Sequence, residues 1–138
     1  MCIRDRLYDA AMIKENHIAW TDNLKNAVQK IRINSPFTTH IIIEAESIEQ
    51  AKEAVLAGAA SVLLDELSPE TIKKSVQELR DLSINSLKKE VNKNLIIEVS
   101  GINPQEISKY LIKGIDLIST SSSITKSEWI DFSMRYIN

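Results

Sequence analysis

Residues 41–70, IIIEAESIEQAKEAVLAGAASVLLDELSPE, contain the pattern of a strand, a helix, a second strand and the start of another helix. The apolar runs Ile41–Glu44 and Ser61–Asp65 are typical of strands buried on both faces. Between them, Ser47 with a glutamine three residues later matches a capping box, and Gly58 is typical of the left-handed residue after a helix. The stretch therefore predicts a right-handed βαβ unit in a parallel sheet.

The same alternation of apolar runs and helix-like segments extends along the rest of the chain. Three more runs end in polar or small residues, namely Ala10–Lys14, Leu95–Gly101 and Asp116–Ser121. Helices are expected over Asn23–Ile33, capped by Thr21 or Asp22, after Ser68-Pro69 and Asn103-Pro104, and over Glu128–Ile137, capped by Ser127. The chain is therefore expected to be an α/β protein with about five parallel βα units.

Two architectures fit this alternation. One is an open five-stranded sheet, and the other is part of a TIM-like (β/α)8 barrel. A full barrel needs roughly 250 residues. If the fold is a barrel, the 138 residues of this chain are enough for only part of it.

The amino-acid composition limits the partners and the cellular compartment to expect for this protein. A net charge of −2 gives no reason to expect a nucleic-acid or anionic-membrane partner. The single Cys2 excludes an internal disulfide framework, and no apolar run approaches the ~20 residues of a membrane span. We therefore expect a cytoplasmic protein.

The start MCIRDR has no signal-peptide pattern and resembles adapter-derived sequence, so Met1–Arg6 is not expected to be native.

Three charged residues fall at the ends of predicted strands. Lys14, Glu44 and Asp65 would meet at the carboxyl edge of a parallel sheet, where βα loops build active sites. An ammonium there could bind a carboxylate or phosphate. The two carboxylates could hold ribose hydroxyls, bind Mg²⁺ through water, or stabilise positive charge at a sugar carbon. The alternative is that they are ordinary loop and helix-start residues.

Two polar loops follow the last two predicted strands. Ser100-Gly101 and Thr120–Ser123 each precede an expected helix start. Backbone N–H groups at such positions suit a phosphate group, although a serine-rich loop is more often only a polar connection. The remaining candidates are expected to be structural: His17 and His40 as hydrogen-bonding residues, and Trp20 and Trp129 as packing residues.

Five ordered motifs resemble those of the quinolinate phosphoribosyltransferases, also called nicotinate-nucleotide pyrophosphorylases (carboxylating). LYDAAMIKENHI, from Leu7 to Ile18, is similar to the family's G-L-x-D-x-x-L-I-K-x-N-H-I. IIIEAESIEQA resembles E-V-E-V-x-S-L-E-Q-A, and SVLLDELSPE resembles I-M-L-D-N-x-S-P-E. EVSGINPQEI and GIDLISTSSSITKS resemble the two loops that follow in the family, E-A-S-G-G-I-x-x-x-N-I and G-V-D-x-I-S-x-G-x-L-T-H-S. The resemblance covers the chain after Arg6.

The resemblance implies a pentosyltransferase of NAD biosynthesis. The family joins quinolinate to phosphoribosyl pyrophosphate with Mg²⁺, giving nicotinate mononucleotide, pyrophosphate and carbon dioxide. Its members have an N-terminal α/β sandwich domain and an incomplete α/β barrel, and they form dimers. Residues 7–138 would be the C-terminal part of that barrel, without the N-terminal domain and the first barrel strands. The family's substrate-binding T-R-K-T segment has no counterpart, so we expect no appreciable activity from this polypeptide alone.

The resemblance also implies roles for individual residues. Lys14 would bind a quinolinate carboxylate, while Glu44 and Asp65 would hold the ribose, stabilise its oxocarbenium-like transition state and lie near Mg²⁺. Substrate contacts would also come from Arg4, Ser100, Gly101, Ser121 and Ser122, the last four near the 5′-phosphate. The chain departs from the family at Ile42, where a glutamate is usual, and at Glu66, where an asparagine is usual. Both phosphate loops also differ in length or lack a glycine.

Two other functions remain open from the sequence. One is a related phosphoribosyltransferase that acts on another base. The other, of a different class, is a non-catalytic phosphate- or nucleotide-binding α/β module.

Overall fold

The computed structural model describes residues 10–20, 23–86, 95–128 and 133–134. Its five strands form one sheet in the order β1-β2-β3-β4-β5, and every neighbouring pair is parallel. The strands are β1 Ala10–Ile13, β2 His40–Ala45, β3 Ser61–Asp65, β4 Ile96–Ser100 and β5 Leu117–Ile118. The predicted parallel α/β fold is confirmed.

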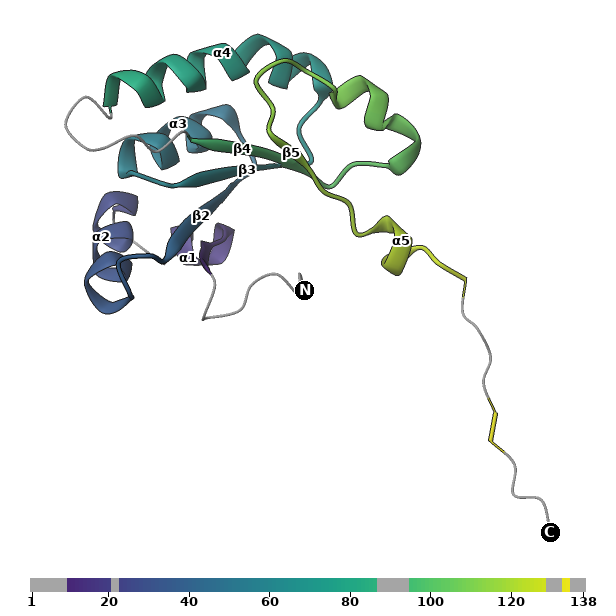
Figure 1. Ribbon diagram of the computed structural model, residues 1–138, viewed down its shortest axis with the longest axis horizontal. Coiled ribbons are helices and arrows are strands. Elements are labelled where there is room, and N and C mark those ends of the chain that lie inside the picture. The colour runs from purple at the N-terminus through teal and green to yellow at the C-terminus, as the bar shows by residue number, and fades with distance from the viewer. Residues whose placement is uncertain (1–9, 21–22, 87–94, 129–132, 135–138) are drawn as a thin grey trace.

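Helices connect the strands, and the three longest form an arc around one side of the sheet (Figure 1). They are α1 Glu15–Ala19, α2 Leu24–Asn34, α3 Ile48–Ala57, α4 Pro69–Ser86, the 3₁₀ helix η1 Pro104–Tyr110 and α5 Ser122–Thr125. Within the described part of the chain, no helix combines the length and apolar character needed to cross a bilayer.

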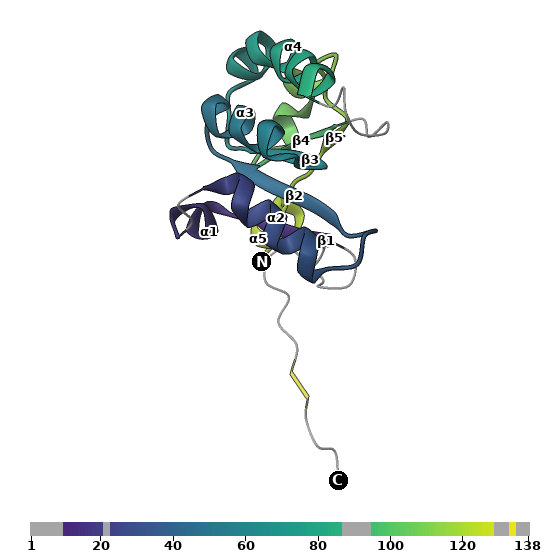
Figure 2. The same cartoon turned by 90° about the vertical axis from the view of Figure 1, so that its left-hand side faces the viewer.

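The way the sheet is wound decides between the two architectures that the sequence allows. Ile43, Val62 and Ile97 occupy one register row, and they pack in a single apolar core with residues of α2, α3 and α4. All three long helices therefore cover the same face, and the strand order follows the chain order (Figure 2). A doubly wound sheet would have helices on both faces and a reversal of strand order. The fold is therefore a partial TIM-like barrel.

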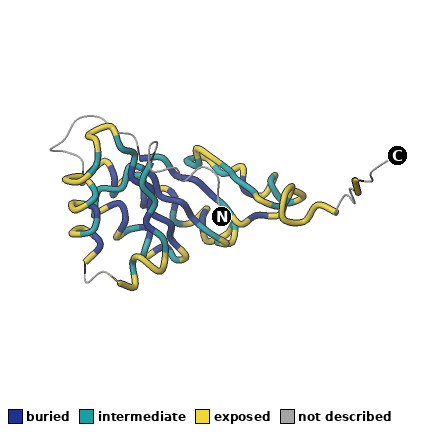
Figure 3. The backbone as a smooth tube through the Cα atoms, turned by 90° about the horizontal axis from the view of Figure 1, so that it is seen from below, coloured by how far each residue is buried: buried dark blue, intermediate teal, exposed yellow. Residues whose placement is uncertain are grey.

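The opposite face of the sheet carries a different row of side chains. Glu44, Leu63 and Glu98 are register partners on three neighbouring strands, one residue out of step with the core row. Because side chains alternate along a strand, this row points away from the helices. All three residues are buried, and buried positions run through the middle of the molecule (Figure 3). The fold therefore places two carboxylates on the inner face of the partial barrel.

Local capping explains most of the helix boundaries. The Ser47 hydroxyl accepts from the Gln50 backbone N–H at 3.2 Å, and Gly58 ends α3 with φ +89°, as predicted. The Gln50 side chain accepts from the Glu46 N–H instead of completing the predicted capping box. Asn23 caps α2 through the Lys25 and Asn26 N–H groups, whereas Thr21 and Asp22 lie outside the described residues.

The C-terminal third differs most from the prediction. The segment after Asn103 is a 3₁₀ helix, whose i→i+3 bonds begin with the Glu106 N–H donating to the Asn103 carbonyl at 2.8 Å. The helix expected over Glu128–Ile137 is wrong at its described residues, because residues 128, 133 and 134 are not helical. The short α5 forms earlier, and the Thr120 hydroxyl accepts the Ser122 N–H at its start at 3.2 Å. Trp129 lies outside the described residues.

Arg80 of α4 ties the amino ends of β4 and β5 to the helix layer. Its guanidinium donates to the carbonyls of Leu95 and Gly114 and to the carboxylate of Asp116. The same Asp116 carboxylate accepts the Ile97 N–H at 2.7 Å. These contacts lie at the edge opposite the predicted site, and residues at that end of a barrel serve stability rather than chemistry.

Removing the Arg80 guanidinium is expected to destabilise the fold. Arg80→Ala should lower the free energy of unfolding by roughly 2–4 kcal/mol, because carbonyls and a carboxylate lose a charged donor. Urea denaturation followed by circular dichroism measures this change. Lys74→Ala, at an exposed position of the same helix, is the control and should change stability by less than about 0.5 kcal/mol. Equal effects of the two variants would contradict the role given to Arg80.

Candidate active site

Lys14 and Glu44 form an ion pair at the carboxyl edge of the sheet. The Lys14 Nζ lies 3.0 Å from the Glu44 Oε2. Lys14 follows the last residue of β1, and Glu44 lies near the end of the neighbouring β2. The side chain of Glu44 is only 11% exposed, whereas that of Lys14 is 40% exposed. The pair therefore presents a solvent-accessible ammonium held by a buried carboxylate.

The environment of Glu44 disfavours its charge. Burial raises the pKa of the Glu44 carboxyl above its ordinary value of 4.5, and the nearby charges of Asp65 and Glu15 act in the same direction. The hydrogen bond and charge of Lys14 lower the pKa without cancelling the effect of burial. A carboxylate that the protein solvates poorly gains most when positive charge develops beside it.

Asp65 is oriented by the neighbouring strand. It pairs in register with Ser100, and the Ser100 hydroxyl donates to Asp65 Oδ1. The family resemblance assigns Ser100 to the substrate phosphate, and in the structure its hydroxyl proton is directed to this carboxylate. The structure therefore brings Lys14, Glu44, Asp65 and Ser100 together along four successive strand ends.

A tight backbone contact joins the loops after β3 and β4. Gly101 has φ +72°, and a β-carbon there would lie 2.7 Å from Glu66 Cγ and 3.1 Å from Asp65 Oδ1. Glu66 itself has φ +53°, a left-handed conformation that is unfavourable for glutamate and easier for asparagine. Gly101 thus permits the loop to pack against the Asp65 carboxylate.

The loop after β5 lies beside the loop after β4. The Thr120 hydroxyl donates to the Ile102 carbonyl at 3.0 Å and also accepts the Ser122 N–H. Ser121 is exposed and Ser122 is half-buried at the start of α5. The two predicted phosphate loops are therefore adjacent in space. Arg4 lies outside the described residues.

Glu98 is a candidate that the sequence analysis missed. It is 2% exposed and shares the inner-face row of Glu44. The available signal was a single charge inside the apolar run of β4, which is unusual for a buried strand.

His40, by contrast, lies at the opposite edge, where its Nε2 is 2.6 Å from the Ser61 hydroxyl. Its predicted structural position is confirmed.

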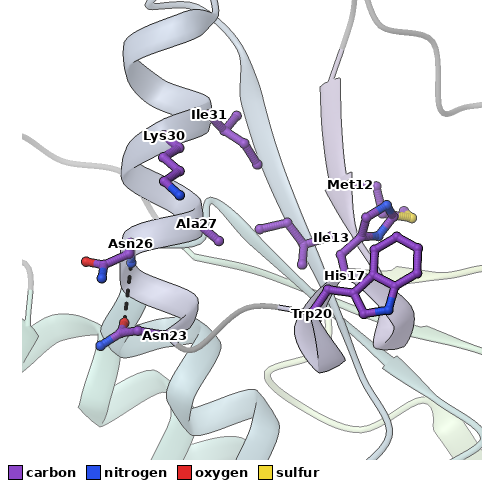
Figure 4. Close-up of a pocket in the computed structure, with 9 residues that line it drawn as sticks. All are labelled: Met12, Ile13, His17, Trp20, Asn23, Asn26, Ala27, Lys30 and Ile31. Carbon is purple, nitrogen blue, oxygen red and sulfur yellow. Dashed lines mark hydrogen bonds between the residues drawn. The ribbon is translucent and has the colours of Figure 1, made fainter.

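A cavity of about 510 Å³ lies beside β1, away from the carboxylates. Met12, His17 and Trp20 line one side, and Ala27, Lys30 and Ile31 of α2 line the other (Figure 4). Trp20 is 86% exposed, so its predicted packing role is wrong. Neither Glu44 nor Asp65 lines this cavity, which separates it from the candidate site.

The donor set limits how a metal could bind. No group of three or more His, Cys, Asp or Glu residues is arranged for a metal within the described ranges. Glu44 and Asp65 supply two carboxylates at one edge. Two carboxylates suit Mg²⁺ that also binds substrate phosphates and waters, rather than a cage made by protein alone.

The fold and the site together define a class: a partial (β/α) barrel with an ammonium, carboxylates and hydroxyl-rich loops at the carboxyl edge of its sheet. Residues 3–135 match the family described as quinolinate phosphoribosyl transferase, C-terminal domain. The chain belongs to this family, as the resemblance of its motifs predicts.

Individual relatives agree with the family match. The chain is 39% identical over 132 residues to a probable nicotinate-nucleotide pyrophosphorylase (carboxylating) of Methanothermobacter thermautotrophicus, covering 95% of this chain and 45% of that protein. A protein of the same name from Synechocystis is 31% identical, with 95% and 42% covered. The crystal structure of NadC from Streptococcus pyogenes superposes with a TM-score of 0.73 at 31% identity, covering 96% and 43%. The chain spans less than half the length of these relatives.

Relieving the backbone strain at Glu66 is expected to stabilise the protein. Glu66→Asn should raise the free energy of unfolding by about 0.5–1 kcal/mol, because asparagine tolerates a positive φ better. Glu66→Ala is the matched control, since it removes the carboxylate but keeps the β-carbon that disfavours this conformation. Chemical denaturation of the three proteins distinguishes the two effects. Equal stabilisation by alanine would show that charge, not backbone conformation, is responsible.

Glu44→Gln is expected to change how stability depends on pH. The folded-state pKa of Glu44 lies above the unfolded value, so the wild type gains stability as pH falls through the folded pKa and loses it as pH rises. Glutamine removes this dependence. The variant should therefore be more stable than wild type at pH 7, and the difference should disappear below pH 4.5, the ordinary value.

Denaturation at several pH values tests this expectation. Lys14→Met is the matched variant, because removing the ammonium should raise the Glu44 pKa further and move the pH window upward. A Glu44→Gln advantage that grows as the pH falls would contradict the assigned direction.

Proposed function

We propose that this chain supplies the ribose-binding and base-binding edge of a quinolinate phosphoribosyltransferase. The reaction joins quinolinate and phosphoribosyl pyrophosphate to give nicotinate mononucleotide, pyrophosphate and carbon dioxide in NAD biosynthesis. The observation that carries the proposal is the 3.0 Å pair of Lys14 and Glu44 next to Asp65. These are the residues to which the family motifs assign the base and the ribose.

Each charge has a distinct task in the proposed reaction. The exposed Lys14 ammonium binds a carboxylate of quinolinate and gives up part of its contact with Glu44 when it does so. Glu44 and Asp65 face the ribose, where positive charge develops at the anomeric carbon as pyrophosphate leaves. Carboxylates already held in place stabilise that charge without reorganising during the reaction. The bond from Ser100 to Asp65 helps to keep that carboxylate in place.

The adjacent loops after β4 and β5 are proposed to bind the 5′-phosphate. Gly101 lets the backbone of the first loop approach closely, and Ser121 and Ser122 bring hydroxyl and N–H groups from the second. The contact of Thr120 with Ile102 supports a shared binding surface. Arg4 is proposed as a further substrate contact on the resemblance of its motif alone.

Mg²⁺ is proposed to enter with phosphoribosyl pyrophosphate near Glu44 and Asp65. Bound there, the ion would neutralise charge on the leaving pyrophosphate. The two carboxylates would hold it directly or through water, since Ile42 stands where the family motif has a further glutamate. We further propose that the parent enzyme is a cytoplasmic homodimer, as the family resemblance implies.

A chimera provides the direct test of these assignments. The matched region of the Methanothermobacter relative is replaced by residues 7–138 of this chain, and nicotinate mononucleotide formation is measured with quinolinate, phosphoribosyl pyrophosphate and Mg²⁺. The chimera is expected to be active, whereas the 138-residue chain alone is not. Asp65→Asn and Glu44→Gln in the chimera should each lower kcat/KM by roughly 10²-fold or more.

Glu46→Gln is the matched control, since this exposed acid lies two residues from Glu44 on the same edge. Its kcat/KM should stay within about threefold of the parent chimera. A folded chimera that prefers another pyridine base would favour the related-transferase alternative. A chain that binds phosphoribosyl pyrophosphate tightly while the folded chimera is inactive would favour the non-catalytic module.

A further inference from the structure

The His17 imidazole is bonded to the backbone of Lys14. The Lys14 N–H donates to His17 Nδ1 at 3.1 Å, and the His17 N–H donates to the Lys14 carbonyl at 2.9 Å. The Ile18 N–H donates to the same carbonyl at 3.0 Å. The first turn of α1 therefore bonds both the N–H and the carbonyl of Lys14.

We propose that His17 is a positioning residue that holds Lys14 where its ammonium reaches Glu44. The proposal rests on the proposed function for the role of Lys14 toward substrate, but the geometry of the pair stands independently. His17 touches neither the proposed substrate nor the reacting atoms. It acts through Lys14 alone.

The position of Lys14 in the fold explains why such a contact matters. The register of β1 with β2 ends at Ile13 and Ile43, so Lys14 lies one residue beyond the ladder. Its backbone is extended, with φ −111° and ψ 173°, and it is the residue that precedes α1. A lysine side chain loses much rotamer freedom when it is held in one ion pair. When the backbone of Lys14 is already fixed, only its side-chain torsions remain to be ordered as the ion pair forms.

The bond defines the protonation state of His17. Nδ1 accepts a hydrogen bond, so in the neutral ring the proton is on Nε2. An imidazolium has two donors and cannot accept from Lys14. Across the cavity from His17 lies Lys30 of α2, whereas β1 contributes the uncharged Met12 and Ile13 (Figure 4).

Glutamine provides a matched replacement for this function. A glutamine at the third position of a helix reaches back to the N-cap N–H in a capping box, and it does not titrate. Leucine has similar bulk but no acceptor. His17→Gln should therefore retain the positioning of Lys14, and His17→Leu should lose it.

Nuclear magnetic resonance of the isotope-labelled 138-residue chain tests the proposal without any activity assay. Two quantities are measured: the protection factor of the Lys14 amide, and the nuclear Overhauser effect between the Lys14 ε-protons and Glu44 γ-protons. In His17→Leu, protection should fall about fivefold, the equivalent of one lost helix cap, and the Overhauser effect should fall at least twofold. In His17→Gln, both should stay within about twofold of wild type.

The outcome that separates positioning from a merely local role is the Overhauser effect. If His17→Leu lost amide protection but kept the Lys14–Glu44 contact, the proposal would be wrong. Should His17→Leu fail to fold, His17→Ala takes its place in the same two measurements. His17→Ala should lose both signals while His17→Gln keeps them, and identical behaviour of the two would overturn the proposal. Failure of the chimera assay would leave this result unaffected.

Discussion

The parallel register of β1 to β4 is the constraint on which the site depends. Each strand enters the sheet in chain order, and each crossover passes over the same face, so the long helices stack on one side. The other face is then free to carry polar side chains at one edge. A slip of one residue in β2 would turn Glu44 toward the helices and Ile43 toward the site. Each β2 side chain therefore faces either the apolar core or the candidate site, and the register decides which.

The two edges of the sheet have opposite electrostatic characters. At the amino edge, the guanidinium of Arg80 satisfies carbonyls and a carboxylate, which stabilises the junction of α4 with β4 and β5. At the carboxyl edge, Glu44 is buried with a raised pKa and shares its surroundings with Asp65. This second arrangement opposes stability at neutral pH but leaves negative charge poorly solvated where the proposed reaction would develop positive charge. Such a division of labour is common in barrels, whose chemistry is confined to one end.

The departures from the family motifs have different physical meanings in the structure. Glu66 occupies a left-handed backbone position where the family motif has asparagine, so the chain keeps the loop shape at some energetic cost. Ile42 is buried and replaces a glutamate of the motif, while Glu98 supplies a second carboxylate on the inner face, with Leu63 between it and Glu44. The structure shows that the sheet edge tolerates these changes without losing the pairing of Lys14 with Glu44.

The sequence by itself determined the parts of this protein that depend on neighbours in the chain. Apolar runs predicted the strands, and capping patterns such as those at Ser47 and Gly58 predicted helix ends, because these signals are local. The short α5 and the 3₁₀ helix were not predicted, since proline and hydroxyl residues there allow several turns. Only the tertiary structure decided that the long helices all cover one face of the sheet, that Ser100 bonds to Asp65 and that Glu98 is buried. Those features join residues far apart in the chain, and packing and register fix them rather than any local propensity.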